Sequence, residues 1–209
     1  MRPKLFLTAV LLLPGVAAAQ GQTSSPPLDS TEHRHLGFFL RADLGVSYLQ
    51  SSASDGSTSL RISGPGLSAG LMFGGALSEN TILAGDLWGM SALTPKVSVA
   101  ASGGSSSDST VQLIGYGVSL TQYFMPANVY VSVSPSLVIL STSNDKGETT
   151  SSTNFGFGGR ASIGKEWWVS EHWGIGVAAQ FAFGVNKDKD GGPTWTTLAG
   201  SLAFSATWN

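Results

Sequence analysis

Apolar and polar residues alternate along most of this chain with the period of a β-strand. In the stretch GFFLRADLGVSYL, from Gly37 to Leu49, one set of alternate positions is apolar, and the other set carries Arg41 and Asp43. Successive side chains of a strand point to opposite faces. This stretch therefore predicts a strand with one apolar face and one face that is small or charged.

The same alternation recurs along the chain and predicts eight strands, at 38–48, 67–74, 83–88, 114–121, 129–134, 157–164, 175–183 and 198–208. Short turns are expected at 78–80, 125–128 and 169–172. Long loops rich in Ser, Gly and Asp are expected at 50–59, 94–109, 141–153 and 185–193. Short and long connections that alternate are typical of an outer-membrane barrel, with short turns in the periplasm and long loops outside the cell.

A membrane-spanning helix is the alternative for the uncharged stretch 109–144. Pro126 and Pro135 interrupt this stretch, which leaves no unbroken apolar run of the ~20 residues that a spanning helix needs. Within hydrocarbon, backbone groups must pair internally, which only helices and closed barrels achieve. The sequence therefore predicts an all-β fold, an eight-stranded antiparallel up-and-down transmembrane barrel over 37–209.

The composition agrees with a membrane barrel and argues against several other classes. Charged residues make up 11% of the 209 residues, against about 25% in soluble domains. The chain has 27 glycines and no cysteine, so disulfides and thiolate chemistry are excluded. The formal net charge of −2 gives no reason to expect a nucleic-acid partner, and no pattern indicates a cofactor.

The N-terminal residues have the features of an export signal. Arg2 and Lys4 precede a short apolar run, and three alanines at 17–19 form a small-residue cleavage site, which predicts a signal peptide at 1–19. Residues 20–36 are polar, and we expect them to form a flexible periplasmic leader that holds His33 and His35 in solvent.

The charges within the strands predict what fills the barrel. An arginine facing lipid at the membrane midplane would cost about 2–4 kcal/mol, so Arg41 and Asp43 must face the lumen. The corresponding faces of other strands add Asp86, Arg160 and Glu166. The interior of an eight-stranded barrel is just wide enough for side chains to fill it. We therefore expect a plugged lumen with an Arg/Asp/Glu network; the alternative is a narrow gated pore in which these pairs exchange partners.

Aromatic residues gather near the predicted strand ends, where tryptophan and tyrosine favour the membrane–water interface. The predicted interface residues are Tyr123, Trp167, Trp168, Trp173 and Trp208 at the periplasmic rim, and Tyr48 and Trp195 at the outer rim.

The segments GFFLRADLGVSY, TQYFMPANVYVSVS and SLAFSATWN resemble those of the small eight-stranded outer-membrane β-barrels, the group that contains the OmpA transmembrane domain and OmpX. The resemblance implies a monomer in the outer membrane of a Gram-negative envelope, surrounded by outer-membrane lipids. It also implies that the barrel-assembly machinery recognises the last strand through Leu202, Phe204 and Trp208.

Some barrels of this group are enzymes that modify lipids at the outer leaflet, and they need a histidine near the external rim. Here His33 and His35 lie in the leader and His172 in a predicted periplasmic turn. A nucleophile needs a base within hydrogen-bond reach, so we expect no enzyme and no catalytic residues.

The segment NKDKDGG resembles the start of a calcium loop, through Asn186, Asp188, Asp190 and Gly191. The position that would hold the glutamate of such a loop is Thr197, so a solvated turn without metal is expected.

These observations favour a structural or surface-interaction role. A narrow pore is the first alternative and a lipid-modifying enzyme is the second. The alternative fold is a soluble calyx, in which the apolar faces would point inward and the polar faces outward.

Overall fold

The computed structural model describes residues 34–54, 59–99, 102–106, 109–144 and 146–209. The predicted signal peptide and the predicted leader as far as His33 lie outside these described residues. Within them, no helix is long and apolar enough to cross a membrane.

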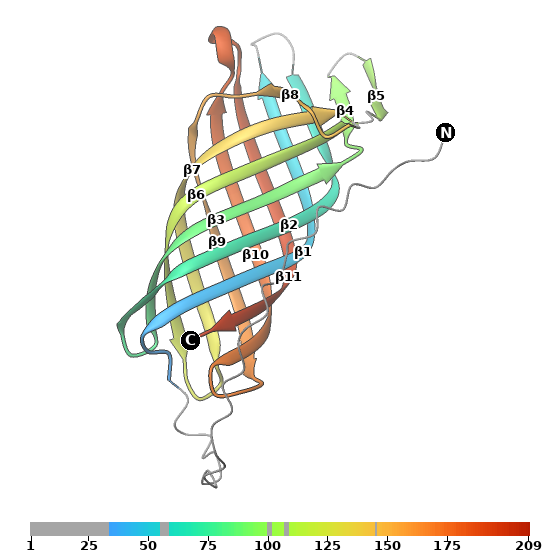
Figure 1. The fold of residues 1–209 in the computed structure, drawn as a ribbon. Helices are drawn as coiled ribbons and strands as arrows, with labels where there is room; N and C mark the ends of the chain where they lie inside the picture. The colour runs from blue at the N-terminus through green and yellow to red at the C-terminus, as the bar shows by residue number, and fades with distance from the viewer. Residues whose placement is uncertain (1–33, 55–58, 100–101, 107–108, 145) are drawn as a thin grey trace, which may run out of the picture. The chain divides into compact units, whose positions relative to one another are not determined.

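In the described part of the chain, eight long strands form a closed antiparallel barrel (Figure 1). The ladder closes because β1 pairs with both β2 and β11, and the predicted eight-stranded barrel is thus confirmed. The strands are β1 (Phe38–Ser54), β2 (Ser59–Ser78), β3 (Thr81–Leu93), β6 (Ser109–Phe124), β7 (Val129–Asn144), β9 (Gly156–Trp168), β10 (Trp173–Lys187) and β11 (Thr194–Trp208).

One end of the barrel, here named the short-turn end, holds three tight turns and both the start of β1 and the end of β11. These turns lie between β2 and β3, between β6 and β7, and between β9 and β10, as the sequence predicts. Asn80 and Asn128 turn the chain with φ of 63° and 50°, a left-handed conformation that asparagine tolerates better than most residues.

At the opposite end, here named the long-loop end, the strands continue much further than the sequence predicts. β1 reaches Ser54 and β2 begins at Ser59, so most of the predicted loop 50–59 is strand. In the predicted loop 94–109, β4 (Lys96–Val99) pairs with β2, and β5 (Ser102–Ser106) pairs with β4. β8 (Thr149–Ser152) pairs with β7, and in the predicted loop 185–193 a 3₁₀ turn forms at Lys189–Gly191. Ser- and Gly-rich segments remain in the sheet here because their backbone groups pair with neighbouring strands, which composition alone does not reveal.

The alternation of side chains places apolar residues outside and polar or small residues inside. On β1, Leu44 is 68% exposed while its neighbour Asp43 is 3% exposed. The exposed large apolar side chains come from all eight barrel strands and surround the barrel as a belt that suits the hydrocarbon of a membrane. A soluble calyx would have the opposite arrangement, so this alternative is wrong.

The interior is packed in two apolar groups with ionic residues between and beside them. The group at the long-loop end consists of Leu49, Trp88, Met90, Ala92, Val111, Leu113, Val138, Leu140, Ala182 and Ala199. The group at the short-turn end consists of Phe39, Met72, Ile82, Ala84, Tyr123, Tyr130 and Ala178.

Candidate functional site

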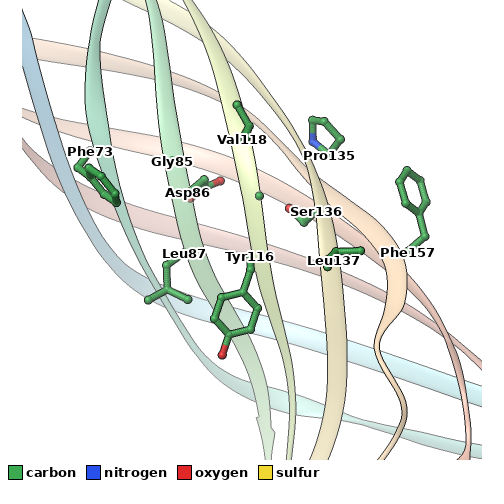
Figure 2. Close-up of a pocket in the computed structure, with 11 residues that line it drawn as sticks. Phe73, Gly85, Asp86, Leu87, Tyr116, Val118, Pro135, Ser136, Leu137 and Phe157 are labelled. Carbon is green, nitrogen blue, oxygen red and sulfur yellow. The ribbon is translucent and has the colours of Figure 1, made fainter.

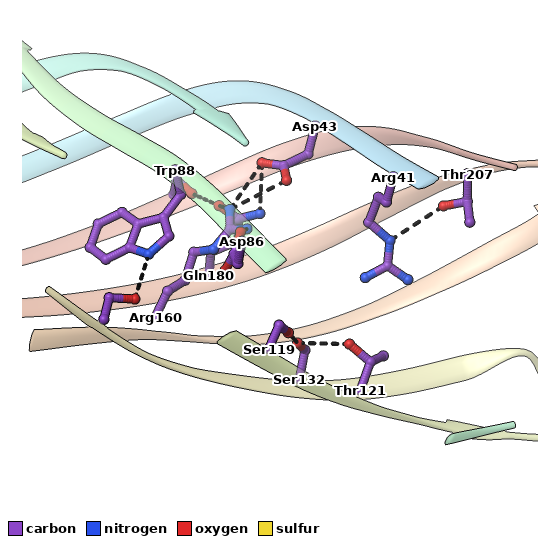
Figure 3. A network of polar contacts seen from close by, with 12 residues as sticks. Arg41, Asp43, Asp86, Trp88, Ser119, Thr121, Ser132, Arg160, Gln180 and Thr207 are labelled. Atoms are coloured by element: carbon purple, nitrogen blue, oxygen red, sulfur yellow. Dashed lines mark hydrogen bonds and ion pairs between the residues drawn. The ribbon is translucent and has the colours of Figure 1, made fainter. Parts of the chain in front are cut away.

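Arg160 on β9 forms the centre of a polar layer in the lumen that joins strands distant in sequence (Figure 3). Its Nη1 lies 3.3 Å from Asp43 Oδ2 on β1, and its Nη2 donates to Asp86 Oδ1 on β3 at 2.6 Å. Gln180 on β10 donates to Asp43 Oδ1 at 3.0 Å, and Ser201 on β11 donates to the Gln180 amide oxygen at 2.9 Å. These five residues, here named the central ionic layer, are all buried and link strands around the barrel.

Glycine at position 70 makes room for this layer. Gly70 is the ladder partner of Asp43 in the β1–β2 pair. A Cβ atom at Gly70 would lie 2.6 Å from Arg160 Nη1, so a side chain there would require the Arg160–Asp43 pair to shift. The ion pair therefore occupies the space that a side chain on β2 would need.

Arg41 forms a second layer, nearer the short-turn end, and its main partner is Glu166. Arg41 Nη2 lies 2.9 Å from Glu166 Oε1, and Thr207 donates to the same oxygen at 2.7 Å. The Tyr123 hydroxyl donates to Glu166 Oε2 at 3.0 Å and accepts from Arg41 Nη2. The Arg41 guanidinium carbon lies 3.9 Å from the centroid of the Tyr130 ring, within the range of a cation–π interaction. These residues are here named the Arg41 layer.

The structure places all five predicted lumen charges inside the barrel: Arg41, Asp43, Asp86, Arg160 and Glu166. Each of them lies in an ion pair. Ions removed from water are tolerated when opposite charges and hydrogen bonds replace the solvent. The two guanidinium groups and three carboxylates meet much of this need through their ion pairs, although Arg41 Nη1, Asp86 Oδ2 and Arg160 Nε have no hydrogen-bond partner among the described residues.

An apolar layer lies in the lumen toward the long-loop end. Trp88 on β3 is its largest member, and its indole Nε1 donates to Ser136 Oγ on β7 at 3.0 Å. Leu49 and Leu113 pack beside it with no exposed surface. This layer is not among the sequence-based predictions. The signal was present, since Leu49 continues the inward alternation of Arg41 and Asp43 with an apolar residue.

His35 is buried at the short-turn end, whereas the sequence predicts a solvated leader. The side chain is 0% exposed, and its ring stacks on Tyr123 with centroids 3.4 Å apart. His35 Nε2 donates to Asn128 Oδ1 at 2.9 Å, and His35 Nδ1 accepts from the Asn209 amide. The backbone N–H of His35 donates to Asn80 Oδ1 at 3.1 Å. Three asparagines, from two turns and the end of the chain, thus hold the residue in place.

The docking of His35 is expected to depend on pH. Burial lowers the pKa of the His35 imidazole below its usual 6.5, while the Asn128 hydrogen bond and the Glu166 carboxylate raise it and Arg41 lowers it. The docked state thus favours the neutral ring, so docking is strongest above pH 6.5 and weakens as the pH falls from 6.5 through the lowered pKa. Hydrogen exchange of the His35 amide, corrected for the intrinsic rate, should show protection that decreases from pH 7.5 to pH 5.

His35→Gln provides the control for this prediction, because glutamine keeps hydrogen-bonding groups but does not titrate in this range. Its corrected protection should not change between these pH values. Equal pH dependence in the two proteins would show that another group is responsible.

Of the predicted interface aromatics, three are exposed on the outer surface: Tyr48, Trp167 and Trp173. Trp208 is half-buried on the same surface, with ring centroids 5.5 Å from Phe38 and 5.7 Å from His172.

The other predicted interface aromatics lie elsewhere. Tyr123 was predicted at the periplasmic interface, but it is buried in the lumen against His35 and Arg41. Trp168 is half-buried with its ring 5.1 Å from His35. Trp195 packs against the apolar layer at the long-loop end. A residue near a strand end can face either the lumen or the lipid, because neighbouring residues of a strand point to opposite faces. Position along the strand alone therefore does not predict which face an aromatic residue occupies.

A groove of about 600 Å³ lies on the outer surface over β3, β6 and β7 (Figure 2). Its apolar walls are Phe73, Leu87, Tyr116, Val118, Leu137 and Phe157. Pro135 on β7 also lines the groove, and the β6–β7 pairing is interrupted between Gly117↔Ser136 and Leu120↔Val133. Proline has no N–H to donate to a ladder, so the barrel wall is less tightly bonded here.

The calcium-like segment forms a turn whose side chains have protein partners. Asn186 is buried and donates to the backbone oxygen of Val138 at 2.8 Å, and Asp188 caps the 3₁₀ turn by accepting from the Lys189 N–H at 2.8 Å. No group of three or more His, Cys, Asp or Glu side chains within the described residues could hold a metal ion.

His172 lies in the turn before β10, at the short-turn end.

No protein-family model matches the chain, and no curated protein matches it significantly. Among solved structures, it is similar to the crystal structure of Neisserial surface protein A (NspA), with 17% identity and a TM-score of 0.55, over 85% of this chain and 99% of that one. It also matches OprG from Pseudomonas aeruginosa, with 11% identity and a TM-score of 0.48, over 84% of this chain and 97% of that one. A third match is the outer membrane protease OmpT from Escherichia coli, with 10% identity and a TM-score of 0.47, over 85% and 99%. With its apolar belt and ionic lumen, the chain has the fold of the small eight-stranded outer-membrane β-barrels.

Proposed function

We propose that this protein is a closed outer-membrane barrel with a structural or surface-interaction role. The observation that carries the proposal is the succession of buried side chains along the lumen. The apolar layer, the central ionic layer, the Arg41 layer and His35 follow one another from the long-loop end to the short-turn end. A continuous water path would have to displace buried side chains at each of these levels.

The long-loop end supports the interaction part of the proposal. There β4, β5 and β8 extend the sheet beyond the eight barrel strands, and β4 and β8 are formed by small polar side chains together with Lys96, Val97 and Val99. A hydrogen-bonded sheet extension presents its surface to partners with less loss of conformational entropy than a flexible loop. A non-enzymatic role agrees with the position of His35 and His172 at the short-turn end.

Recordings in planar lipid bilayers test the closed lumen. The wild type is expected to give no discrete conductance steps at either polarity, at pH 7.5 and at pH 5. Arg41→Ala is also expected to be silent, because the central ionic layer and the apolar layer remain. A general porin in the same lipid controls for the sensitivity of the recording. Reproducible steps from folded wild-type protein would show a pore and contradict the proposal.

A further inference from the structure

A second groove, of about 580 Å³, lies on the outer surface over β9, β10, β11 and β1. Its outward-facing lining is apolar except for one cation, Lys165. Here it is named the Lys165 groove, and its outward-facing residues are Val46, Ile163, Lys165, Val177, Ala179, Leu202 and Phe204. Because the barrel lies in a membrane, this groove faces lipid.

The shape of the Lys165 groove follows from one small residue among large ones. Ala179 on β10 is the ladder partner of Ile163 on one side and of Leu202 on the other. Its methyl group leaves a depression between these longer side chains. Phe204 and Leu202 are 76% and 66% exposed, so they stand away from the barrel and form one wall. A depression of this kind between apolar walls has the shape and chemistry to hold an acyl chain.

Lys165 lies where this groove meets the short-turn end. It pairs with Val129, the first residue of β7, and its Nζ donates to the backbone oxygen of Ala127 in the adjacent turn at 2.6 Å. The same Nζ lies 5.7 Å from the ring centroid of Trp167, a residue exposed at this rim. Lysine extends its charge toward the membrane surface in this manner when its Cα lies deeper.

The ammonium group of Lys165 has bonding capacity that the protein does not use. An ammonium carries three N–H donors, and one of them is directed to Ala127. No carboxylate within the described residues forms an ion pair with Lys165. A cation at the membrane interface without a protein counter-charge attracts the negative groups of lipids.

We propose that the Lys165 groove is a binding site for one anionic phospholipid of the leaflet at the short-turn end. Its phosphate lies on Lys165, beside Trp167, and one acyl chain lies over Ala179 between Ile163 and Leu202. Lys165 recognises the charge of the headgroup, and the depression at Ala179 recognises the acyl chain. Mutation can therefore test headgroup binding and acyl-chain binding separately.

Native mass spectrometry of the protein released from nanodiscs that contain equal amounts of phosphatidylglycerol and phosphatidylcholine, with identical acyl chains, tests this proposal. The wild type is expected to retain phosphatidylglycerol in preference. Lys165→Gln should reduce this preference about fivefold, the effect of one interfacial cation, while glutamine still provides a donor for Ala127. The matched control is Lys187→Gln, which removes an exposed lysine from the last position of β10 at the long-loop end and should leave the preference unchanged.

Ala179→Phe tests the acyl-chain part of the site. The larger side chain should fill the depression and reduce retention of both lipids, with their ratio unchanged. An unchanged lipid ratio in Lys165→Gln, or an equal loss in Lys187→Gln, would overturn the proposal. So would a dimer of this chain that Ala179→Phe abolishes, because the groove would then hold a second copy. Heat-modifiable migration in gels confirms that each variant is folded before it is compared.

Discussion

Replacement of Arg160 by methionine is expected to lower the free energy of unfolding by about 3–5 kcal/mol, the range for removal of one partner from a buried ion pair. Arg160 is the ion-pair partner of both Asp43 and Asp86. Without the guanidinium, two carboxylates remain in the lumen with no opposite charge beside them. Both aspartates lose their ion pair, and Asp43 keeps the hydrogen bond from Gln180. Urea titration of the barrel in liposomes, followed by tryptophan fluorescence, measures the change.

Two further variants show whether charge, rather than side-chain volume, causes this loss. The triple variant Arg160→Met with Asp43→Asn and Asp86→Asn has no buried charge in the central ionic layer, so it should recover much of the lost stability. Arg41→Met should cost less than Arg160→Met, because Glu166 keeps hydrogen bonds from Thr207 and Tyr123. A triple variant as unstable as Arg160→Met would show that packing dominates.

The alternation of side chains in β1 explains why so much of the barrel could be predicted. Arg41 and Asp43 share a face, and the cost of a charge in lipid leaves only the lumen for that face. The cost of a charge in lipid also places Asp86 and Arg160 on the lumen side. That the two residues lie at the same level of the barrel follows only from the register between strands. The sequence therefore predicts that these charges face inward but not that Arg160 contacts both aspartates.

His35 and Tyr123 show what this reasoning misses. The period of two ends before Phe38, so no pattern indicates that His35 returns to the barrel, and its surroundings of Pro and polar residues are typical of a flexible leader. Its position depends on Asn80, Asn128 and Asn209, which lie in two turns and at the end of the chain. Contacts that join such distant residues follow from closure of the barrel and have no local sequence signal.

Layers of different chemistry in one lumen have a consequence for folding. In β-barrels a register shift of one residue moves every side chain of the shifted strand to the opposite face, so such a shift of β9 would move Arg160 into lipid and Phe157 into the lumen. The central ionic layer thus disfavours incorrect registers of β9 against β10 more strongly than an entirely apolar interior would. The ion pairs contribute to the specificity of the fold through the cost of misplacing them.

Replacement of Trp88 by alanine is the second change with a large expected effect, a loss of about 3–5 kcal/mol in the free energy of unfolding. Trp88 is 1% exposed, and its removal leaves a cavity in the apolar layer and removes the hydrogen bond to Ser136. Trp173→Ala is the matched control: this side chain is exposed on the outer surface, and its loss should have a much smaller effect. Urea titrations in liposomes compare the two variants with the wild type.

Gly115 allows the same contact to be tested from the opposite side. A Cβ atom at Gly115 would overlap the Trp88 indole, so Gly115→Ala alone should destabilise the barrel through overpacking, by about 1–3 kcal/mol. In the Trp88→Ala background that overlap is gone, and the added methyl group occupies part of the cavity. The double variant should therefore be more stable than the sum of the single changes predicts, with a coupling above about 0.5 kcal/mol. Strict additivity would mean that the indole does not occupy the space above Gly115, and the packing described for the apolar layer would be wrong at its largest side chain.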